Sequence, residues 1–183
     1  MTANQEFHPD FHLNRVLYPS SDPGLRRFIE RFQAHEKRDV LVQETFDRLQ
    51  KTLQVNRVVL YYFYHQWKGQ VTFEALSHPK WSIYGSTGAD ECFSDEYAAL
   101  YMAGRTRSIS DIEREPIHSC HQDFLRQIKV KANLVVPILM NQQQLWGLLV
   151  AHHCESSRFW LSSELELLKD AAQMLAVQLA NLA

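Results

Sequence analysis

The sequence predicts an α+β fold, with a central antiparallel sheet and helices on its flanks. Three observations support this prediction: helical periodicity at both ends of the chain, two pairs of strand-like segments between them, and no βαβ alternation or internal repeat. A chain of 183 residues is long enough for one domain with a sizeable core. We expect residues 1–21 to form an N-terminal arm and residues 22–183 to form the domain.

The first helical region is expected to start at Asp22 and Pro23, because aspartate caps helices and proline suits the first turn. Asp39 restarts the helical periodicity. The apolar stripes of the two parts consist of Leu25, Phe28, Ile29 and Phe32, followed by Val42, Phe46, Leu49 and Leu53. These spacings predict helices before the first strand.

Four segments have the pattern of strands. Residues 57–65 are β-branched and aromatic on both alternating faces, which predicts an internal strand covered on both sides. Residues 70–77 alternate more clearly and are expected to complete a hairpin with that strand. Residues 132–140 and 145–154 predict a second hairpin, in which Pro137 favours a sheet edge or a bulge.

The segments between the hairpins are expected to form a loop and two helices. Residues 78–93 contain Pro and Gly and predict a long loop, which inside a compact domain is often functional. Helices are predicted for residues 94–105 and from Pro116 to about Lys129.

Ser163 and Glu166 predict a capping box for the last helix. The apolar positions of this helix are Leu165, Leu168, Ala172, Leu175, Leu179 and Leu182. Their spacing is that of a coiled-coil seam, although packing on the sheet explains it equally well.

Composition excludes several classes of function. The formal net charge of −2 gives no basic surface for nucleic acid and no polybasic patch for a membrane. No apolar run is long enough to span a bilayer, and the polar start lacks a signal peptide, so we expect a cytoplasmic protein without membrane contact. The three cysteines include no CxxC pair, which argues against a disulfide framework and a thiol zinc site.

The segment "HSCHQDF", residues 118–124, is the strongest local candidate for chemistry. An imidazole beside a thiol, as in Cys120-His121, can take the thiol proton and produce a nucleophile. A thiol hydrolase also needs an orienting third group, and no flanking signature indicates one. A half-buried cysteine next to a surface histidine is the simpler alternative.

The end of the last strand carries His152 and His153, which point to opposite faces because strand side chains alternate. They are therefore poor joint metal ligands. One is expected to face a pocket, although a histidine with satisfied partners in the core is equally consistent. Arg105 and Arg107 suit bidentate binding of a carboxylate, or are simply solvated charges after a helix.

The segment "ADECFSDE", residues 89–96, places Cys92 among four carboxylates and beside Phe93. Negative neighbours disfavour the thiolate, so Cys92 is expected to be a poor nucleophile on its own. Cys154 is expected to be a small buried hydrophobic residue.

Together these segments resemble a GAF domain of the phytochrome superfamily. "RVVLYYF", "LVVPIL" with "LWGLLVAHHC", and the closing helix resemble the GAF fold, over about residues 39–182. The "SCH" motif, the "GR…SISDI" stretch (104–112) and "DECF" (90–93) resemble the DXCF-type cyanobacteriochromes, photoreceptor domains that hold a linear tetrapyrrole, or bilin. The two cysteines are 28 positions apart, in the order and setting of that family.

The resemblance implies a bilin pocket on one face of the sheet. Cys120 matches the cysteine that bonds ring A permanently, and His121 matches the residue that packs on the bilin and hydrogen-bonds near its pyrrole nitrogens. Asp90 matches the aspartate that accepts from the pyrrole N–H groups. Cys92 matches the cysteine that adds reversibly to the central methine bridge.

Four further residues are implied near the bilin. His152 corresponds to the histidine near the ring D carbonyl, and Arg105 to a propionate partner. Tyr101 lies near the pocket in this resemblance, and Phe93 belongs to the "DECF" motif.

The implied function is light sensing by a covalently bound phycocyanobilin or phycoviolobilin. The resemblance implies a blue/green-type photoswitch that combines 15Z/15E isomerisation with a second, reversible thioether. Bilin attachment is self-catalysed in the family, so we expect a binding module and no enzyme.

Expected partners are an output domain of a longer signalling protein and a second copy through the terminal helices. Two alternatives are a GAF domain for another ligand, such as a cyclic nucleotide, and a thiol enzyme built on Cys120-His121.

Overall fold

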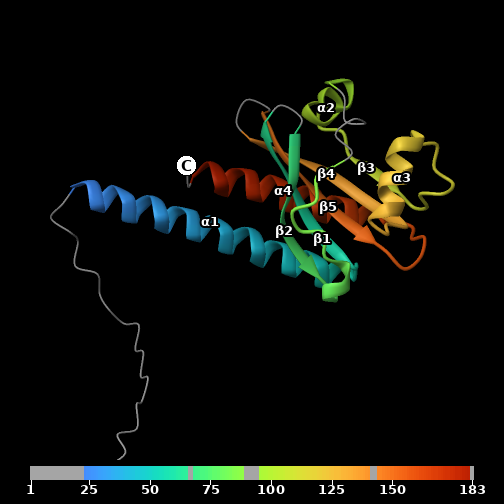
Figure 1. The fold of residues 1–183 in the computed structure, drawn as a ribbon, viewed down its shortest axis with the longest axis horizontal. Coiled ribbons are helices and arrows are strands. Elements are labelled where there is room, and N and C mark those ends of the chain that lie inside the picture. The colour runs from blue at the N-terminus through green and yellow to red at the C-terminus, as the bar shows by residue number, and fades with distance from the viewer. Residues whose placement is uncertain (1–22, 66–67, 89–94, 141–143, 182–183) are drawn as a thin grey trace, which may run out of the picture.

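The computed structural model describes residues 23–65, 68–88, 95–140 and 144–181. Five strands form one antiparallel sheet, in the order β2-β1-β5-β4-β3 (Figure 1). The strands are β1 (Arg57–His65), β2 (Lys68–Leu76), β3 (Arg107–Ile109), β4 (Ala132–Met140) and β5 (Gln144–His153). The helices are α1 (Pro23–Leu53), the 3-10 helix η1 (Pro79–Trp81), α2 (Asp95–Met102), α3 (Ser119–Gln127) and α4 (Ser162–Ala180). The predicted α+β fold with two hairpins is confirmed; the predicted arm lies outside the described residues.

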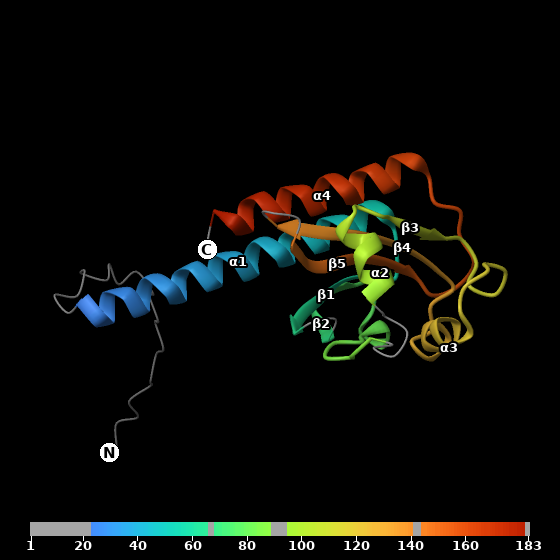
Figure 2. The same cartoon turned by 90° about the horizontal axis from the view of Figure 1, so that it is seen from above.

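The helices divide between the two faces of the sheet. Helices α1 and α4 run side by side against one face, while α2 and α3 lie on the other (Figure 2). The main core fills the space between the sheet and the α1–α4 pair, with Phe46, Leu60, Leu149 and Leu175 among its buried members. The opposite face carries a smaller apolar cluster, which leaves room for a cavity.

Helix α1 is continuous through Asp39, so the expected restart of periodicity there is not a break. The segment around Asp39 contains neither proline nor glycine, and its charged residues are compatible with a helix. The C-terminal part of α1 packs on the core, through Val42 and Leu53 among others. The N-terminal part extends beyond the sheet (Figure 1).

Two predicted helix starts are wrong by a few residues. Helix α3 begins at Ser119 and not at Pro116, because His118 is its N-cap and accepts from the backbone N–H of Cys120 at 3.3 Å. Helix α4 begins at Ser162, where the carboxylate of Glu164 accepts from the backbone N–H of Leu161 at 2.8 Å. The predicted capping box of Ser163 and Glu166 is therefore replaced by Glu164.

The apolar stripe of α4 packs on the sheet and on α1. Of the two explanations offered for its spacing, packing on the sheet is therefore the one that the structure shows. Its buried members are Leu168, Ala172, Leu175 and Leu179. Pro137 lies where β4 is an open edge, because β3 pairs only with residues 133–135, and a bulge follows at Ile138/Leu139. Among the described residues, no helix is both long and apolar enough to cross a membrane.

The packing of α4 gives a direct test of the fold. Leu175 is fully buried, whereas Val177 of the same helix is 58% exposed. We expect Leu175→Ala to lower the free energy of unfolding by about 2–5 kcal/mol, because it leaves a cavity between α4 and the sheet. The control Val177→Ala should change it by less than about 0.5 kcal/mol. Urea denaturation measures both, and equal effects would contradict the packing.

Candidate functional site

A cavity of about 630 Å³ lies on the sheet face that α1 and α4 leave free. This volume is in the range of small-molecule sites, roughly 300–1,000 Å³. The sheet contributes Val59, Tyr61, Val71, Arg107, Asn133, Val135, Leu148, Val150 and His152. The helices and loops contribute Ile83, Gly88, Tyr97, Tyr101, Ile117, His118, Cys120, His121, Phe124, Leu125 and Ile128.

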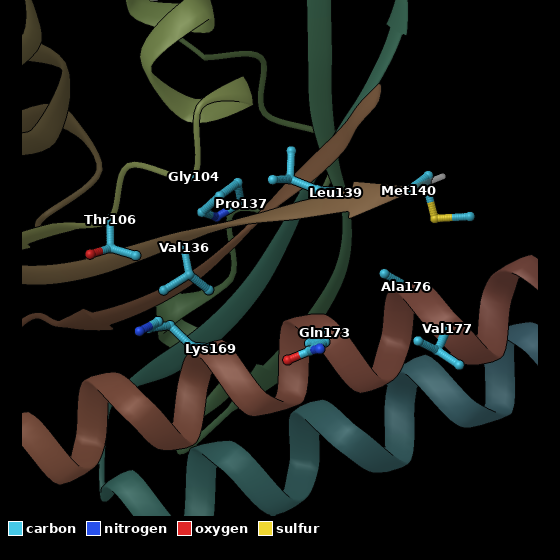
Figure 3. Close-up of a pocket in the computed structure, with 10 residues that line it drawn as sticks. All are labelled: Gly104, Thr106, Val136, Pro137, Leu139, Met140, Lys169, Gln173, Ala176 and Val177. Atoms are coloured by element: carbon cyan, nitrogen blue, oxygen red, sulfur yellow. The ribbon is translucent and has the colours of Figure 1, made fainter. Parts of the chain in front are cut away.

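A second cavity, of about 390 Å³, lies between α4 and the part of β4 that extends beyond its pairing with β3 (Figure 3). Its polar side chains are Thr106, Lys169 and Gln173, and the rest of its lining is apolar or glycine. None of the residues that the sequence predicts for a site lines it. The larger cavity is therefore the candidate site.

At one end of the larger cavity is a row of three polar residues on adjacent strands, of which His152 and Asn133 line the cavity and Arg57 lies behind them. In the sheet register, His152 of β5 lies opposite both Arg57 of β1 and Asn133 of β4. All three are buried, with exposures of 1% for Arg57, 4% for His152 and 2% for Asn133. The next row on the same face of the sheet is apolar, formed by Val59, Val150 and Val135.

Arg57 is the anchor of this polar row. Its Nε donates to Nδ1 of His152 at 2.8 Å, and its two terminal nitrogens donate to the carbonyls of Trp81 at 2.8 Å and Ile128 at 2.6 Å. A guanidinium only donates, so Nδ1 of His152 must be the unprotonated nitrogen. A neutral His152 therefore carries its proton on Nε2.

Two of the three histidines in the cavity wall, His121 and His152, have environments that favour the neutral form. Burial, followed by the charge of Arg57 and then that of His121, keeps the pKa of His152 well below its ordinary value. Burial, and secondarily the charge of Arg107, also lowers the pKa of His121. A neutral imidazole offers one donor and one acceptor, so each ring has a defined hydrogen-bonding polarity.

Asn133 is the polar group of the cavity whose oxygen lacks a partner. Within the described part of the chain, its Oδ1 is buried and accepts no hydrogen bond. An unsatisfied buried carbonyl is costly, at about 1–3 kcal/mol. Because Asn133 lines the cavity, a ligand with an N–H group is a natural partner for it.

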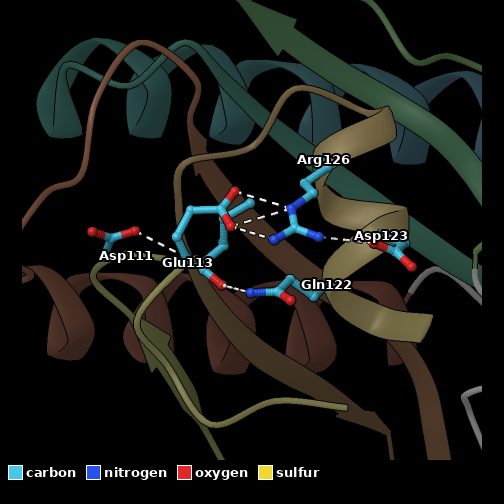
Figure 4. Close-up of polar contacts among 6 residues, drawn as sticks. Asp111, Glu113, Gln122, Asp123 and Arg126 are labelled. Carbon is cyan, nitrogen blue, oxygen red and sulfur yellow. Dashed lines mark hydrogen bonds and ion pairs between the residues drawn. The ribbon is translucent and has the colours of Figure 1, made fainter. Parts of the chain in front are cut away.

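Helix α3 carries Cys120 and His121 and is fixed to the domain by an apolar cluster of Ile109, Ile112, Leu125 and Val130. Polar contacts add to this attachment (Figure 4). Arg126 pairs with Glu113 and Asp123, and the side chain of Gln122 donates to the Ile112 carbonyl at 2.7 Å. The hydrogen bond from Arg126 lowers the pKa of Glu113, but these charges are exposed and contribute little stability.

The structure places four of the predicted residues in the cavity wall: Cys120, His121, His152 and Tyr101. Burial raises the pKa of Tyr101, which keeps its hydroxyl protonated. Arg105 is not part of the cavity wall. Its guanidinium lies 5.7 Å from the ring centroid of Tyr97, and Tyr97 does line the cavity. The arginine of the wall is Arg107, paired with Glu115 at 3.0 Å.

The other three predicted residues, Asp90, Cys92 and Phe93, lie outside the described residues. The described residues on either side of them that line the cavity are Gly88 and Tyr97. The backbone N–H of Gly88 donates to the hydroxyl of Tyr61 at 2.9 Å, which fixes the chain at the cavity wall just before this segment.

The remaining predictions for the last strand are confirmed. His153 points away from the cavity, and its Nδ1 lies 2.9 Å from the Ser156 carbonyl. Cys154 is buried, and its backbone N–H donates to Oδ1 of Asn56 at 2.7 Å. In the described ranges, no cluster of His, Cys, Asp and Glu is suited to a metal ion.

Arg57 and Asn133 are absent from the sequence-predicted site. The sequence does contain one indication for Arg57: it is a charged residue at the start of a strand whose following residues are β-branched and aromatic on both faces. Asn133 similarly interrupts the apolar run 132–138. Sheet register, which a single sequence does not specify, is needed to place both beside His152.

Comparisons with known proteins agree with this architecture. The GAF domain model matches residues 37–179. An uncharacterised protein of Picosynechococcus sp. (strain PCC 7002) is 50% identical over 155 residues, covering 85% of this chain and 94% of that protein. The circadian input-output histidine kinase CikA of Synechocystis sp. (strain PCC 6803) is 31% identical over 198 residues, covering 96% of this chain but only 26% of CikA.

Among solved structures, the chain is similar to GAF domains of photoreceptors. The blue-light absorbing form of the Thermosynechococcus elongatus PixJ GAF domain is 29% identical, with a TM-score of 0.75 over 81% of this chain and 88% of that chain. A phycocyanobilin-bound GAF domain from a cyanobacterial phytochrome is 29% identical, with a TM-score of 0.71 over 86% of this chain and 92% of that chain. The chain thus belongs to the GAF domain family and is similar, in sequence and fold, to its cyanobacteriochrome and phytochrome members.

Proposed function

We propose that this protein is a light-sensing domain that binds a linear tetrapyrrole covalently. The observation that carries the proposal is the convergence of Cys120, His121 and His152 on one largely apolar cavity. These residues come from α3 and β5, and each matches a bilin-contacting position in the resemblance drawn from the sequence. Similar solved GAF domains hold phycocyanobilin and phycoerythrobilin, which supports the same ligand class here.

Each wall residue has a chemical task in this proposal. From the first turn of α3, the thiol of Cys120 would add across a carbon–carbon double bond of the ring A side chain, its sulfur and its proton each bonding to one of the two carbons, and His121 would pack on the bilin. His152 donates from Nε2 to the ring D carbonyl, because Arg57 occupies Nδ1. Arg105 or Arg107 binds a propionate, and Arg107 is the one that already faces the cavity.

Cys92 supplies the second, reversible bond. The bilin contributes light absorption and isomerisation of the double bond before ring D. The Cys92 sulfur gives an electron pair to the central methine carbon of the cationic bilin, and the thiol proton is released, so no oxidant is required. Asp90 accepts from the pyrrole N–H groups and favours that cation. Cys92 is four residues from Gly88, a distance of at most about 14 Å, which is within reach of the cavity.

The terminal helices are the proposed output, because strand β5 borders both the cavity and the helical layer. His152 and Val150 face the cavity, whereas Leu149 and Ala151 face the core shared with α1 and α4. A change in the cavity can therefore bias the position of these helices. The projecting part of α1 is the proposed contact to a second copy or to an output domain.

Two other functions account for less of the site. A GAF domain for a cyclic nucleotide leaves the two motif cysteines without a task. A thiol enzyme centred on Cys120 needs a third group that orients His121, but within the described part of the chain the His121 ring contacts Phe124 and forms no hydrogen bond. We therefore propose a binding module that attaches and switches its own bilin but turns over no substrate.

Production in cells that make phycocyanobilin tests the proposed function. We expect a coloured protein whose band fluoresces with zinc after denaturing electrophoresis. Cys120→Ala should lose this fluorescence because it removes the sulfur of the permanent bond. Cys154→Ala, a cysteine outside the cavity, should keep it. A colourless wild-type protein contradicts the proposal.

The role of Cys92 is tested by its replacement with alanine. We expect Cys92→Ala to retain the bilin through Cys120 but to lose the short-wavelength, blue-absorbing form, because the conjugated system is no longer interrupted. Absorption spectra before and after illumination measure this. Survival of the blue band in this variant means that Cys92 forms no such bond.

The neutral state of His152 predicts how stability depends on pH. Its pKa is well below that of an unfolded histidine, about 6.5, so between pH 7 and 5 the unfolded chain takes up a proton that the folded protein excludes. The free energy of unfolding should therefore decrease as the pH is lowered from 7 to 5, and His152 should contribute up to about 1.4 kcal/mol per pH unit to this decrease. His152→Gln should reduce this slope, whereas the exposed His35→Gln serves as the control. Urea denaturation of the bilin-free proteins at several pH values measures this dependence. An unchanged slope in His152→Gln would contradict the prediction.

A further inference from the structure

Two buried asparagines of this protein differ in one respect. Oδ1 of Asn56 accepts from the backbone N–H of Cys154 at 2.7 Å, so this asparagine is part of the framework. Oδ1 of Asn133 has no such partner in the described part of the chain, although Asn133 is the more buried of the two. Asn133 lines the cavity, whereas Asn56 does not.

The neighbour of Asn133 offers the complementary group. His152 lies directly opposite Asn133 in the register of β4 and β5, so both side chains reach the same region of the cavity. Arg57 occupies Nδ1 of His152, which leaves Nε2–H as the donor of the ring. An acceptor, Oδ1 of Asn133, and a donor, Nε2–H of His152, thus stand side by side on neighbouring strands.

Such a pair matches a lactam, a cyclic amide in which one carbon carries both the carbonyl oxygen and the N–H. We propose that Asn133 is a ligand-binding residue whose Oδ1 accepts the N–H of the terminal lactam ring, while His152 donates to the carbonyl of that ring. This inference rests on the proposed function, because both ends of a linear tetrapyrrole are lactams. The ring concerned is the one beside His152, and Arg57 sets the polarity of the pair by fixing the tautomer of His152.

Three variants test this assignment in the whole chain, each prepared with and without phycocyanobilin. Asn133→Leu keeps a similar volume and removes the acceptor, whereas Asn133→Asp keeps an acceptor oxygen. Asn56→Leu is the matched control, because it removes a buried amide that already has a partner. Urea midpoints and the ¹⁵N–¹H resonances of isotope-labelled bilin are measured.

The two asparagines are expected to behave in opposite ways. Without bilin, Asn133→Leu should have a urea midpoint equal to or above that of the wild type, since it removes an unsatisfied polar atom. Bilin should then raise its midpoint less than it raises that of the wild type. Asn56→Leu should lower the midpoint in both forms. The lactam N–H resonance beside His152 should move upfield in Asn133→Leu and stay near its wild-type position in Asn133→Asp and Asn56→Leu.

Two results overturn the assignment. One is an Asn133→Leu midpoint that falls without bilin as far as that of Asn56→Leu, which makes Asn133 a framework residue. The other is an unchanged lactam resonance in Asn133→Leu. A wild-type protein that takes up no bilin contradicts the proposed function instead, and the bilin-free midpoints still separate a framework residue from a ligand-binding one.

Discussion

The hydrogen bond from Arg57 to His152 is the interaction on which the candidate site depends. A buried guanidinium is costly unless its donors are used, and Arg57 donates to His152, to the Trp81 carbonyl and to the Ile128 carbonyl. Ile128 is the C-cap of α3, where a positive charge interacts favourably with the helix dipole. One side chain therefore orients the imidazole of β5 and also holds the helix that carries Cys120.

Alternation along the strands separates binding from packing. Residues of β5 that face α1 and α4 complete the main core, while the residues between them form the cavity floor. The floor is apolar over most of its area, and its polar side chains include Asn133 and His152 at one end. A long ligand with an apolar middle and a polar end fits this distribution better than a uniformly polar one does.

Local sequence patterns predicted four of the five strands and the four α-helices, because each has a strong period of its own, whereas the three-residue strand β3 was not predicted. The β1 strand matched residues 57–65 throughout, and the split of His152 and His153 between two faces followed from strand alternation alone. Helix starts were less predictable, since the caps of α3 and α4 use the imidazole of His118 and the carboxylate of Glu164 rather than the expected residues. Asn133 and Arg57 were not predicted as site residues. Their position beside His152 depends on the pairing of neighbouring strands, which is defined only when the sheet is assembled. Arg105 and Arg107 are equivalent in sequence, and only the short pairing of β3 with β4 brings Arg107 into the wall.

The tautomer of His152 is the most direct test of how this site is organised. Nitrogen-15 NMR of the imidazole, in protein with and without phycocyanobilin, reports which ring nitrogen is protonated. At neutral pH we expect a neutral ring with the proton on Nε2 in both forms, and a shift of the Nε2–H signal alone when the bilin binds. A proton on Nδ1, or a doubly protonated ring, contradicts the arrangement in which Arg57 sets the polarity of the cavity.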